Sequence, residues 1–228
     1  MKQQWRIAIL SVSACILLIV HRYPGQPAFF DAHLARGFLF NPANELYRWL
    51  YSFAATFIVL GLLPAALGCF LWNERPSEWG LTLGRRKLFG LVAALLLCAL
   101  SLPLLHYVSG LPHISAGHPL CRLAANHRAA FIIYEGFLVL AIVGREFVFR
   151  GFLLFGLKKH VGEAAVYLQL VPYVVLHFGK PPVEVLGAIP AGVILGHLAS
   201  FTGSVWYGIL LHSLWAVALD AFIVIDPF

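Results

Sequence analysis

Residues 131–157 read FIIYEGFLVLAIVGREFVFRGFLLFGL, an apolar run long enough to cross a bilayer that nevertheless carries charged side chains. The charged residues are Glu135, Arg145, Glu146 and Arg150. Each charge near the centre of a membrane helix costs at least about 2.5–3.5 kcal/mol, so four of them cannot all face lipid. We therefore expect this helix to turn its charges inward, to pair them, or to bring them to water.

Helical geometry places most of these charges on one face. At about 100° per residue, Glu146 and Arg150 lie about 40° apart and one turn along the same stripe. Glutamate preceding arginine by four is also the favoured order for a helical ion pair. Glu135 is about 20° from Glu146 in azimuth but about 16 Å away along the axis. Arg145 lies about 100° off this stripe and is expected to point to an interface or to another helix.

A purely structural bridge between Glu146 and Arg150 is the plain alternative to a functional site. Buried ion pairs do occur in helix bundles, but they stabilise weakly because desolvation offsets most of the attraction.

The composition around this helix is that of a membrane protein. Of 228 residues, 61% are hydrophobic and 11% are charged, whereas about 25% are charged in a typical soluble domain. Soluble globular and disordered classes are therefore excluded. The sequence predicts an all-α fold, a polytopic transmembrane helical bundle of about seven spans with a conical or clustered polar site inside it. The apolar blocks fall at 5–22, 48–72, 88–109, 129–157, 162–177, 183–201 and 204–224.

The ends of these blocks predict how the chain meets the membrane. Lys2 and Arg6 precede the first block, which lacks a small-residue cleavage site, so an uncleaved first span is favoured over a secretion signal. The 162–177 block is short for a bilayer and could be partly interfacial. The basic residues favour a cytoplasmic N-terminus only mildly. We expect an integral multi-pass protein of a prokaryotic plasma membrane, with the lipid bilayer as a partner.

Two other kinds of site are disfavoured. The net charge is +6, but the basic residues are scattered rather than clustered, so nucleic acid is not an expected partner. Of four cysteines, Cys15, Cys69 and Cys98 lie in apolar runs and only Cys121 lies in a loop, with no CxxC motif. Neither a disulfide framework nor a cysteine-based metal site is supported.

Two of the ten histidines stand out because they lie in apolar segments. His177 ends VPYVVLHFG, four residues after Tyr173, and His212 lies within WYGILLHSLWAVALD. A lone intramembrane histidine is more often a packing residue, but two of them beside an inward pair of charges favour a polar site. Six histidines are assigned to loops or span ends: His21, His33, His113, His118, His127 and His160.

A carboxylate with two imidazoles can activate a water molecule and stabilise an oxyanion. The same groups could bind a metal ion, although no HExxH motif is present. A serine protease is disfavoured, because Ser213 cannot face its neighbour His212 along a helix and no GxSxG motif occurs.

Three motifs in order make the chain similar to a known family. REFVFRG at 145–151, Tyr173-xxx-His177 and GSVWYGILLHSLWA at 203–216 resemble motifs of the CAAX-prenyl-protease and bacteriocin-processing family. Its members are intramembrane endopeptidases that commonly bear EExxxR, FxxxH and HxxxN on successive helices. EWGLTLGRRK at 78–87 also resembles the loop before the family's core.

The resemblance covers about residues 78–220 and implies a division of the chain. Residues 1–77 would hold N-terminal transmembrane spans and a loop, and residues 78–228 would form the protease-like core.

Matched position by position, Glu146 and Arg150 correspond to the second glutamate and the arginine of the first motif. His177 corresponds to the histidine of the second motif, with Tyr173 in place of phenylalanine, and His212 corresponds to the histidine of the third. The resemblance implies that Glu146 and His177 hold the attacking water, that His212 stabilises the oxyanion, and that Arg150 keeps Glu146 ionised.

The chain departs from the family at two positions. Arg145 stands where the first glutamate is usual, and Ala216 stands where the third motif has asparagine. Asp220 lies one turn beyond Ala216 and could partly compensate, but we expect it at the end of its span near the surface.

The resemblance implies an endopeptidase that cuts a membrane-associated protein or peptide. Arg145 and Ala216 keep a second class open, a non-catalytic relative that acts as a membrane scaffold, chaperone or immunity-type binding protein. Transporters and lipid enzymes form a third class, since buried charges also mark ion pathways. No cofactor is required by these motifs, and water activation by a divalent metal such as zinc stays open at this point.

Overall fold

The structure of the protein, a computed structural model, describes residues 2–35 and 43–225. Every regular element in these two ranges is a helix, which confirms the predicted all-α class. The longer helices are α1 (Lys2–Arg22), α3 (Ala43–Phe57), α4 (Leu63–Trp72), α5 (Lys87–Ser109), α8 (Arg128–Glu146), α12 (Pro182–Thr202) and α13 (Trp206–Ile225). The shorter ones are α2 (Pro27–Phe29), α6 (Pro112–Ser115), α7 (Arg122–Asn126), α9 (Gly156–Val161), α10 (Ala164–Leu168) and α11 (Leu170–Leu176). π-Helical segments are η1 (Phe30–Leu34), η3 (Ile58–Leu62) and η5 (Phe147–Phe155), and η4 (Pro76–Trp79) is a 3-10 turn.

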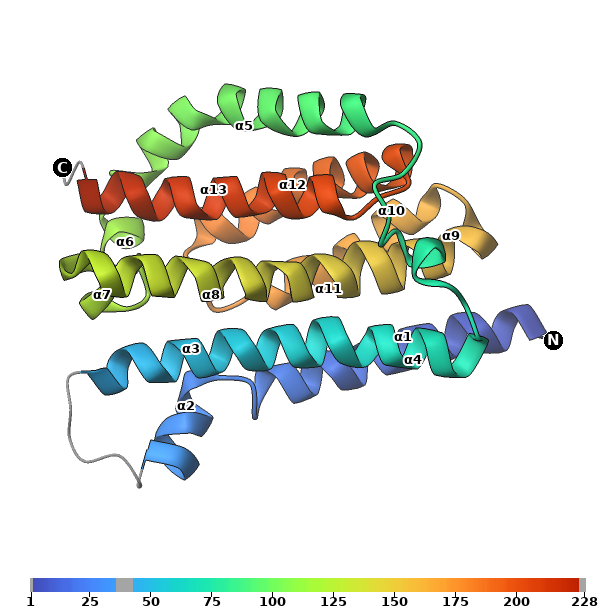
Figure 1. Ribbon diagram of the computed structural model, residues 1–228, viewed down its shortest axis with the longest axis horizontal. Helices are drawn as coiled ribbons and strands as arrows, with labels where there is room; N and C mark the ends of the chain where they lie inside the picture. Colours follow the sequence, from blue (N-terminus) through green and yellow to red (C-terminus); the bar gives the residue numbers. More distant parts are fainter. Residues whose placement is uncertain (1, 36–42, 226–228) are drawn as a thin grey trace.

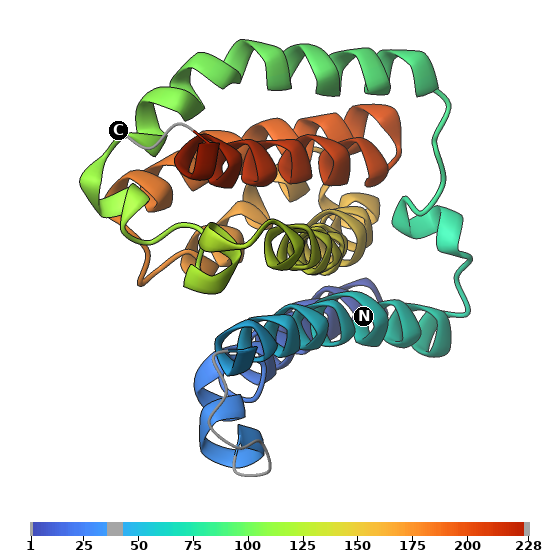
Figure 2. The same ribbon diagram turned by 60° about the vertical axis from the view of Figure 1, so that its left-hand side comes forward.

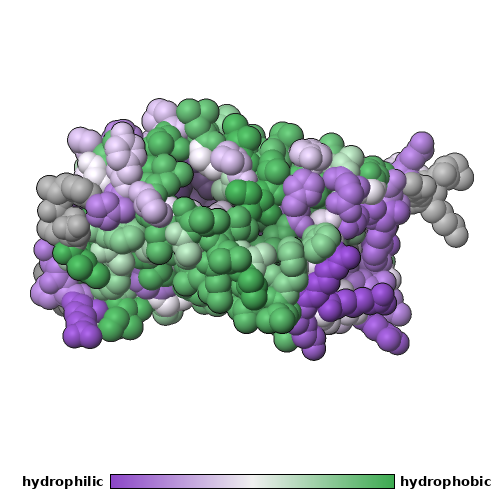
Figure 3. Space-filling model, turned by 90° about the horizontal axis from the view of Figure 1, so that it is seen from above, coloured by the Kyte–Doolittle hydropathy of each residue, from purple (hydrophilic) through white to green (hydrophobic). Residues whose placement is uncertain are grey.

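Within the described ranges, five helices are long and apolar enough to span a membrane. They are Gln4–Arg22, Asn44–Trp72, Lys87–Ser109, Pro182–Thr202 and Trp206–Ile225. The space-filling view agrees, because a broad hydrophobic band lies between more hydrophilic ends (Figure 3). The protein is therefore an integral membrane protein by the length and composition of these helices. The charged helix from Arg128 and the short apolar pair at 164–176 are not among the five, so the total of about seven spans stays a prediction.

Helix α8 occupies the middle of the bundle. It packs against α3 on one side and against α13 on the other, while α5 lies beyond α13 at the periphery (Figures 1 and 2). Its continuation through η5 and α9 also contacts α1, α10 and α12. Glu135, Glu146 and Arg150 of this helix and its continuation are thus buried within the protein, as the sequence predicts.

Glycines allow α8 and the α3–η3 helix to approach closely. A Cβ atom at Gly144 would lie 2.9 Å from the Cα atom of Phe57 and 2.9 Å from the carbonyl oxygen of Thr56. A Cβ atom at Gly61 would lie 3.2 Å from the Cα atom of Gly144. Small residues at such crossings let membrane helices gain packing and backbone contacts that a larger side chain would prevent.

The segment η5 begins immediately after Glu146 and continues the same helix with wider, i to i+5 turns. Such segments recur at functional sites because they re-aim side chains without ending the helix. Phe147, Phe149 and Phe152 are buried here and fill the core between η5 and its neighbours.

The loop before α5 enters this core. Trp79 is 2% exposed and its ring stacks on Phe152 with centroids 5.6 Å apart. Gly80 has a positive φ of 73°, and a Cβ atom there would clash with the Phe155 ring. Within the stretch that resembles the family's loop, Trp79 and Gly80 are therefore part of the packed interior, whereas Arg85, Arg86 and Lys87 are exposed.

A second loop closes the opposite end of the bundle. It runs from Gly110 through α6 and a cis His118–Pro119 peptide bond to Cys121, and Ile114 and Cys121 are both fully buried. In Figure 1 this segment lies beside the start of α8 and the end of α13. Its side chains can therefore reach the ends of several helices at once.

Candidate functional site

Glu146 is fully buried and lies at the centre of a polar cluster. Its Oε1 atom accepts a hydrogen bond from Nη1 of Arg150 at 3.0 Å and another from Nδ1 of His212 at 2.8 Å. Because a carboxylate can only accept, Nδ1 of His212 must carry the proton, and Nε2 of that ring is left for other partners. The predicted Glu146–Arg150 pair thus forms, and it includes His212 from α13.

Arg150 is fully buried and joins three elements. Its Nη2 atom donates to the carbonyl oxygen of Gly192 at 3.4 Å, and its Cζ atom lies 4.2 Å from the centre of the Tyr173 ring. The guanidinium therefore meets a carboxylate, a carbonyl and an aromatic face, three groups that favour a cation away from water. Tyr173, which replaces the family's phenylalanine, keeps the ring that packs on this cation.

His177 lies at the end of α11 with one ring nitrogen engaged. Its Nδ1 atom is 2.9 Å from the carbonyl oxygen of Tyr173, which can only accept, so Nδ1 is the donor. In the neutral ring, Nε2 is then a free acceptor. His177 lies within electrostatic range of Glu146 and of His212, and no direct hydrogen bond joins it to either within the described residues.

One oxygen of the central carboxylate is unoccupied. Oε2 of Glu146 is buried without a hydrogen-bond partner in the part of the chain that the structure describes. A Cβ atom at Gly208 would lie only 3.1 Å from it. The absence of a side chain at Gly208 thus keeps one acceptor of a buried carboxylate uncovered, where it could receive a proton from a bound molecule.

Arg145 is half-buried and unpaired. No ion pair or hydrogen bond of its side chain is found among residues 2–35 and 43–225, and its Nε atom is buried without a partner. Its charge acts on His177 and on His212. The position that holds an acid in the family therefore carries a positive charge here, and that charge acts on both histidines.

Ala216 and Asp220 do not supply the missing asparagine. Ala216 packs against the apolar cluster of Phe53, Tyr134 and Ile142. Asp220 was expected near the surface, and that expectation is wrong: it is 1% exposed, and its Oδ1 atom accepts a hydrogen bond from Nδ1 of His118. The carboxylate is drawn inward because the 110–121 loop folds over the end of α13.

Two of the histidines assigned to loops or span ends are more deeply placed than that assignment predicts. His118 does lie in a loop, yet its side chain is only 13% exposed and both ring nitrogens contact carboxylates. His21 does end α1, yet it is 4% exposed and lies 3.4 Å from the hydroxyl of Thr56. Residue spacing carried no signal for either contact, because each partner is distant in sequence.

The described residues contain no group of three or more histidine, cysteine, aspartate or glutamate side chains arranged to hold a metal ion. Near His177 and His212, the carboxylate of Glu146 bonds through Oε1 to Arg150. The positive charge of Arg150 disfavours a second cation beside this oxygen. The donor set as arranged is suited to hydrogen bonding.

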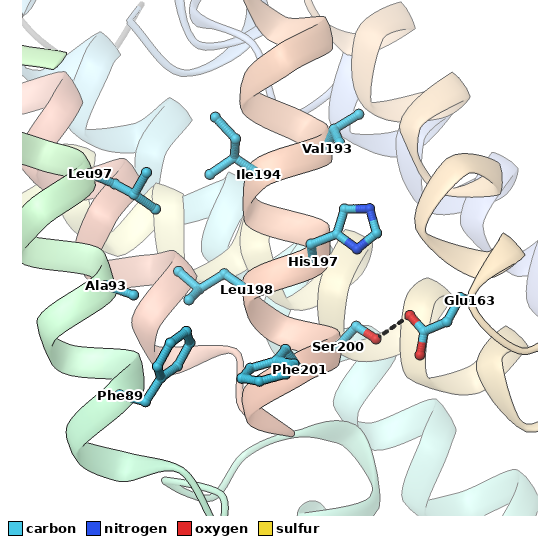
Figure 4. Close-up of a pocket in the computed structure, with 10 residues that line it drawn as sticks. All are labelled: Phe89, Ala93, Leu97, Glu163, Val193, Ile194, His197, Leu198, Ser200 and Phe201. Atoms are coloured by element: carbon cyan, nitrogen blue, oxygen red, sulfur yellow. Dashed lines mark hydrogen bonds between the residues drawn. The ribbon is translucent and has the colours of Figure 1, made fainter. Parts of the chain in front are cut away.

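A lateral groove of about 600 Å³ lies away from this cluster, between α5 and α12 (Figure 4). Phe89, Leu97 and Ile194 form its apolar wall. Ser200 at its polar end donates a hydrogen bond of 2.6 Å to Glu163. None of the residues bonded to Glu146 lines the groove, so it is separate from the candidate site.

A comparison with protein families agrees with the motifs. Residues 127–218 match the family described as Rce1-like type II CAAX prenyl endopeptidases. The match begins just before α8 and ends within α13, and it contains Glu146, Arg150, His177 and His212. No curated protein and no solved structure matches the chain significantly.

Proposed function

Because residues 127–218 carry a domain of the Rce1-like type II CAAX prenyl endopeptidase family, we propose that the protein is an intramembrane endopeptidase. Its substrate would be a membrane-associated protein or peptide. The observation that carries the proposal is the fully buried Glu146, which is held by Arg150 and His212 on one oxygen and is unoccupied on the other.

In the proposed reaction, Oε2 of Glu146 accepts a proton from a water molecule that also donates to Nε2 of His177. The water oxygen bonds to the carbonyl carbon of the scissile peptide, and the π electrons of the C=O bond move to the carbonyl oxygen. Glu146 then returns the proton to the leaving nitrogen as the C–N bond breaks. General-base catalysis of this kind contributes typically 10²–10⁴-fold.

His212 and Arg145 would stabilise the developing negative charge. His212 donates from Nδ1 to the Glu146 carboxylate, and its Nε2 could donate to the substrate oxygen when the ring is protonated. Arg145 adds a second positive charge near both histidines. Such charges act strongly where water is excluded.

Arg150 would act as a positioning residue. It would hold Glu146 ionised through their ion pair, and its own guanidinium is bonded to the Gly192 carbonyl of α12. A carboxylate paired with arginine is a weaker base. The ion pair would therefore orient the Glu146 carboxylate while it lowers its basicity.

A non-catalytic membrane scaffold or immunity-type binding protein is the second candidate. It is favoured by one specific observation, the apolar packing of Ala216 where the family places an amide donor. The two candidates differ in whether any peptide bond is cut.

The test compares the N- and C-termini of membrane proteins in cells that carry the wild type, Glu146→Gln or His177→Ala. New termini in the wild type that both variants lose would support the endopeptidase. The matched control is Glu163→Gln, which changes an exposed carboxylate outside the site and should behave as the wild type. Identical termini in all strains, with a phenotype on deletion of the whole gene, would support the scaffold instead.

A further inference from the structure

A second polar cluster lies at the other end of α8, about 16 Å along the helix from Glu146. It is built from Glu135 on α8, Asp220 on α13, Glu184 at the start of α12, and His118 in the loop that closes this end. Nδ1 of His118 lies 3.0 Å from Oδ1 of Asp220, and Nε2 lies 3.2 Å from Oε1 of Glu184.

His118 must be a cation in this arrangement. Each ring nitrogen faces a carboxylate oxygen, which can only accept a hydrogen bond, so both nitrogens must carry protons. Burial opposes the charged ring, but the hydrogen bonds and charges of Asp220 and Glu184 outweigh it and raise the pKa of His118 to about 9.

The innermost carboxyl groups lack donors. Glu135 is 7% exposed, and neither of its oxygens has a hydrogen-bond partner within the described residues; the same is true of Oδ2 of Asp220. The carboxyl groups of Glu135 and Asp220 nevertheless lie within hydrogen-bonding range of each other. Two ionised carboxylates in that position would repel, whereas one proton between them would give both a partner.

Charge balance in the cluster also favours one proton on the pair of Glu135 and Asp220. Lys180 donates to Glu184 at 2.8 Å and, with His118, supplies two positive charges. Glu184 and Asp220 balance them, so an ionised Glu135 would leave one buried negative charge uncompensated. Among the described residues, the Tyr134 hydroxyl and the Cys121 thiol also lie near the cluster, and the hydroxyl accepts from the backbone of Leu120.

We propose that Glu135 and Asp220 form a proton-binding site, in which one shared proton joins α8 to α13. The proton lies between an oxygen of Glu135 and Oδ2 of Asp220, and no other bond forms or breaks. Glu184 and His118 connect the pair to solvent, since their side chains are 15% and 13% exposed whereas the side chain of Asp220 is 2% exposed.

The proton shared by Glu135 and Asp220 would control the geometry of the polar cluster around Glu146. Helix α8 also carries Glu146, and α13 also carries His212, so the shared proton holds together the two helices that the Glu146–His212 bond joins. Loss of the proton at high pH would place two like charges between these helices. This consequence for cleavage rests on the proposed function, whereas the proton site itself does not.

The direct test is infrared difference spectroscopy of the full-length protein in lipid nanodiscs. A buried protonated carboxyl group gives a C=O stretching band, distinct from ionised carboxylate bands, that shifts in D₂O. We expect the wild type to show this band at neutral pH and to lose it reversibly at high pH. Glu135→Gln and Asp220→Asn should each abolish the band, because the remaining carboxylate can accept from the new amide. Glu163→Gln should retain it.

Absence of the band in folded wild-type protein, or its persistence in both variants, would overturn the proposal. The titration of the wild type needs no variant, so a folding failure in Glu135→Gln does not leave the proton site undecided. A band that titrates and is abolished in both variants, in a protein that cuts no substrate, would retain the proton site and reject the endopeptidase.

Discussion

Nδ1 of His212 and Oε1 of Glu146 lie 2.8 Å apart, although the two residues are 66 positions apart in the chain. This bond fixes α13 against the point where α8 passes into η5, and it determines which nitrogen of His212 faces the open side of the site.

If Nε2 stabilises an oxyanion, His212→Ala should lower the cleavage rate about 10²–10³-fold. The rate is measured on a membrane-associated reporter peptide, with His197→Ala in the separate lateral groove as the control. Equal rates in the wild type and His212→Ala would remove His212 from the reaction.

Gly208 tests the uncovered oxygen of Glu146. Because a Cβ atom would lie 3.1 Å from Oε2, Gly208→Ala should displace a molecule bound there and lower turnover about 10–100-fold. Gly187→Ala is the matched control, since a Cβ atom there meets nothing within 4 Å among the described residues. Thermal stability separates the two effects: a Gly208→Ala variant that melts much earlier would indicate a packing defect rather than a blocked site.

Arg150 should make a large contribution to the free energy of unfolding. Arg150→Met leaves Glu146 as a buried carboxylate without its cation, which should destabilise the protein by about 3–5 kcal/mol. The double variant Glu146→Leu with Arg150→Met removes both charges and should recover much of that loss while staying inactive. Chemical denaturation in micelles measures the free energy of unfolding. A double variant as unstable as the single one would mean that Arg150 acts through Tyr173 and Gly192 instead.

Arg145 should affect rate more than stability. Arg145→Gln removes an unpaired charge near His177 and His212, so we expect turnover to fall roughly tenfold while the substrate KM changes little. The measurement is a full kinetic curve with the reporter peptide. Faster turnover in Arg145→Gln would show that this charge opposes the reaction, and Arg145→Glu would then be the variant to compare with the family's usual acid.

His118 gives the stability of the protein a defined dependence on pH. Its pKa is about 9 in the folded chain and about 6.5 without its partners, so its ion pairs stabilise fully below about pH 6.5 and are lost as the pH rises through 9. A difference of this size corresponds to about 3 kcal/mol. Denaturation at several pH values between 6 and 10 should show this decline in the wild type. His118→Gln should show a flatter profile, and equally steep profiles would contradict the assignment.

The polar cluster around Glu146 could be predicted from the sequence because charged residues are scarce in the apolar segments. Glu146 and Arg150 are four apart on a helix whose other charges cannot face lipid, so helical geometry alone predicts their contact. His177 and His212 were identified because they interrupt apolar segments. These signals are local, and the cost of burying a charge in a membrane makes them strong.

The second polar cluster could not be found in this way. His118 and Asp220 are 102 positions apart, and His118 looks like any other loop histidine until the loop folds over the helix ends. Asp220 near the end of an apolar run is also what a surface residue looks like. Local spacing has no information about which loop covers which helix end, and the π-helical turn after Glu146 was likewise without a sequence signal.

The insertion of Trp79 beside Phe152 has a consequence for how this chain can be divided. The matched segment, 127–218, holds Phe152, but Trp79 lies outside it, as do Leu10 and Leu60 of the same apolar core. A fragment limited to the matched residues would expose the ring face that Trp79 covers and would lose α1, η3 and α4, which also pack against η5. The segment recognised by sequence comparison is therefore smaller than the unit that shares this apolar core.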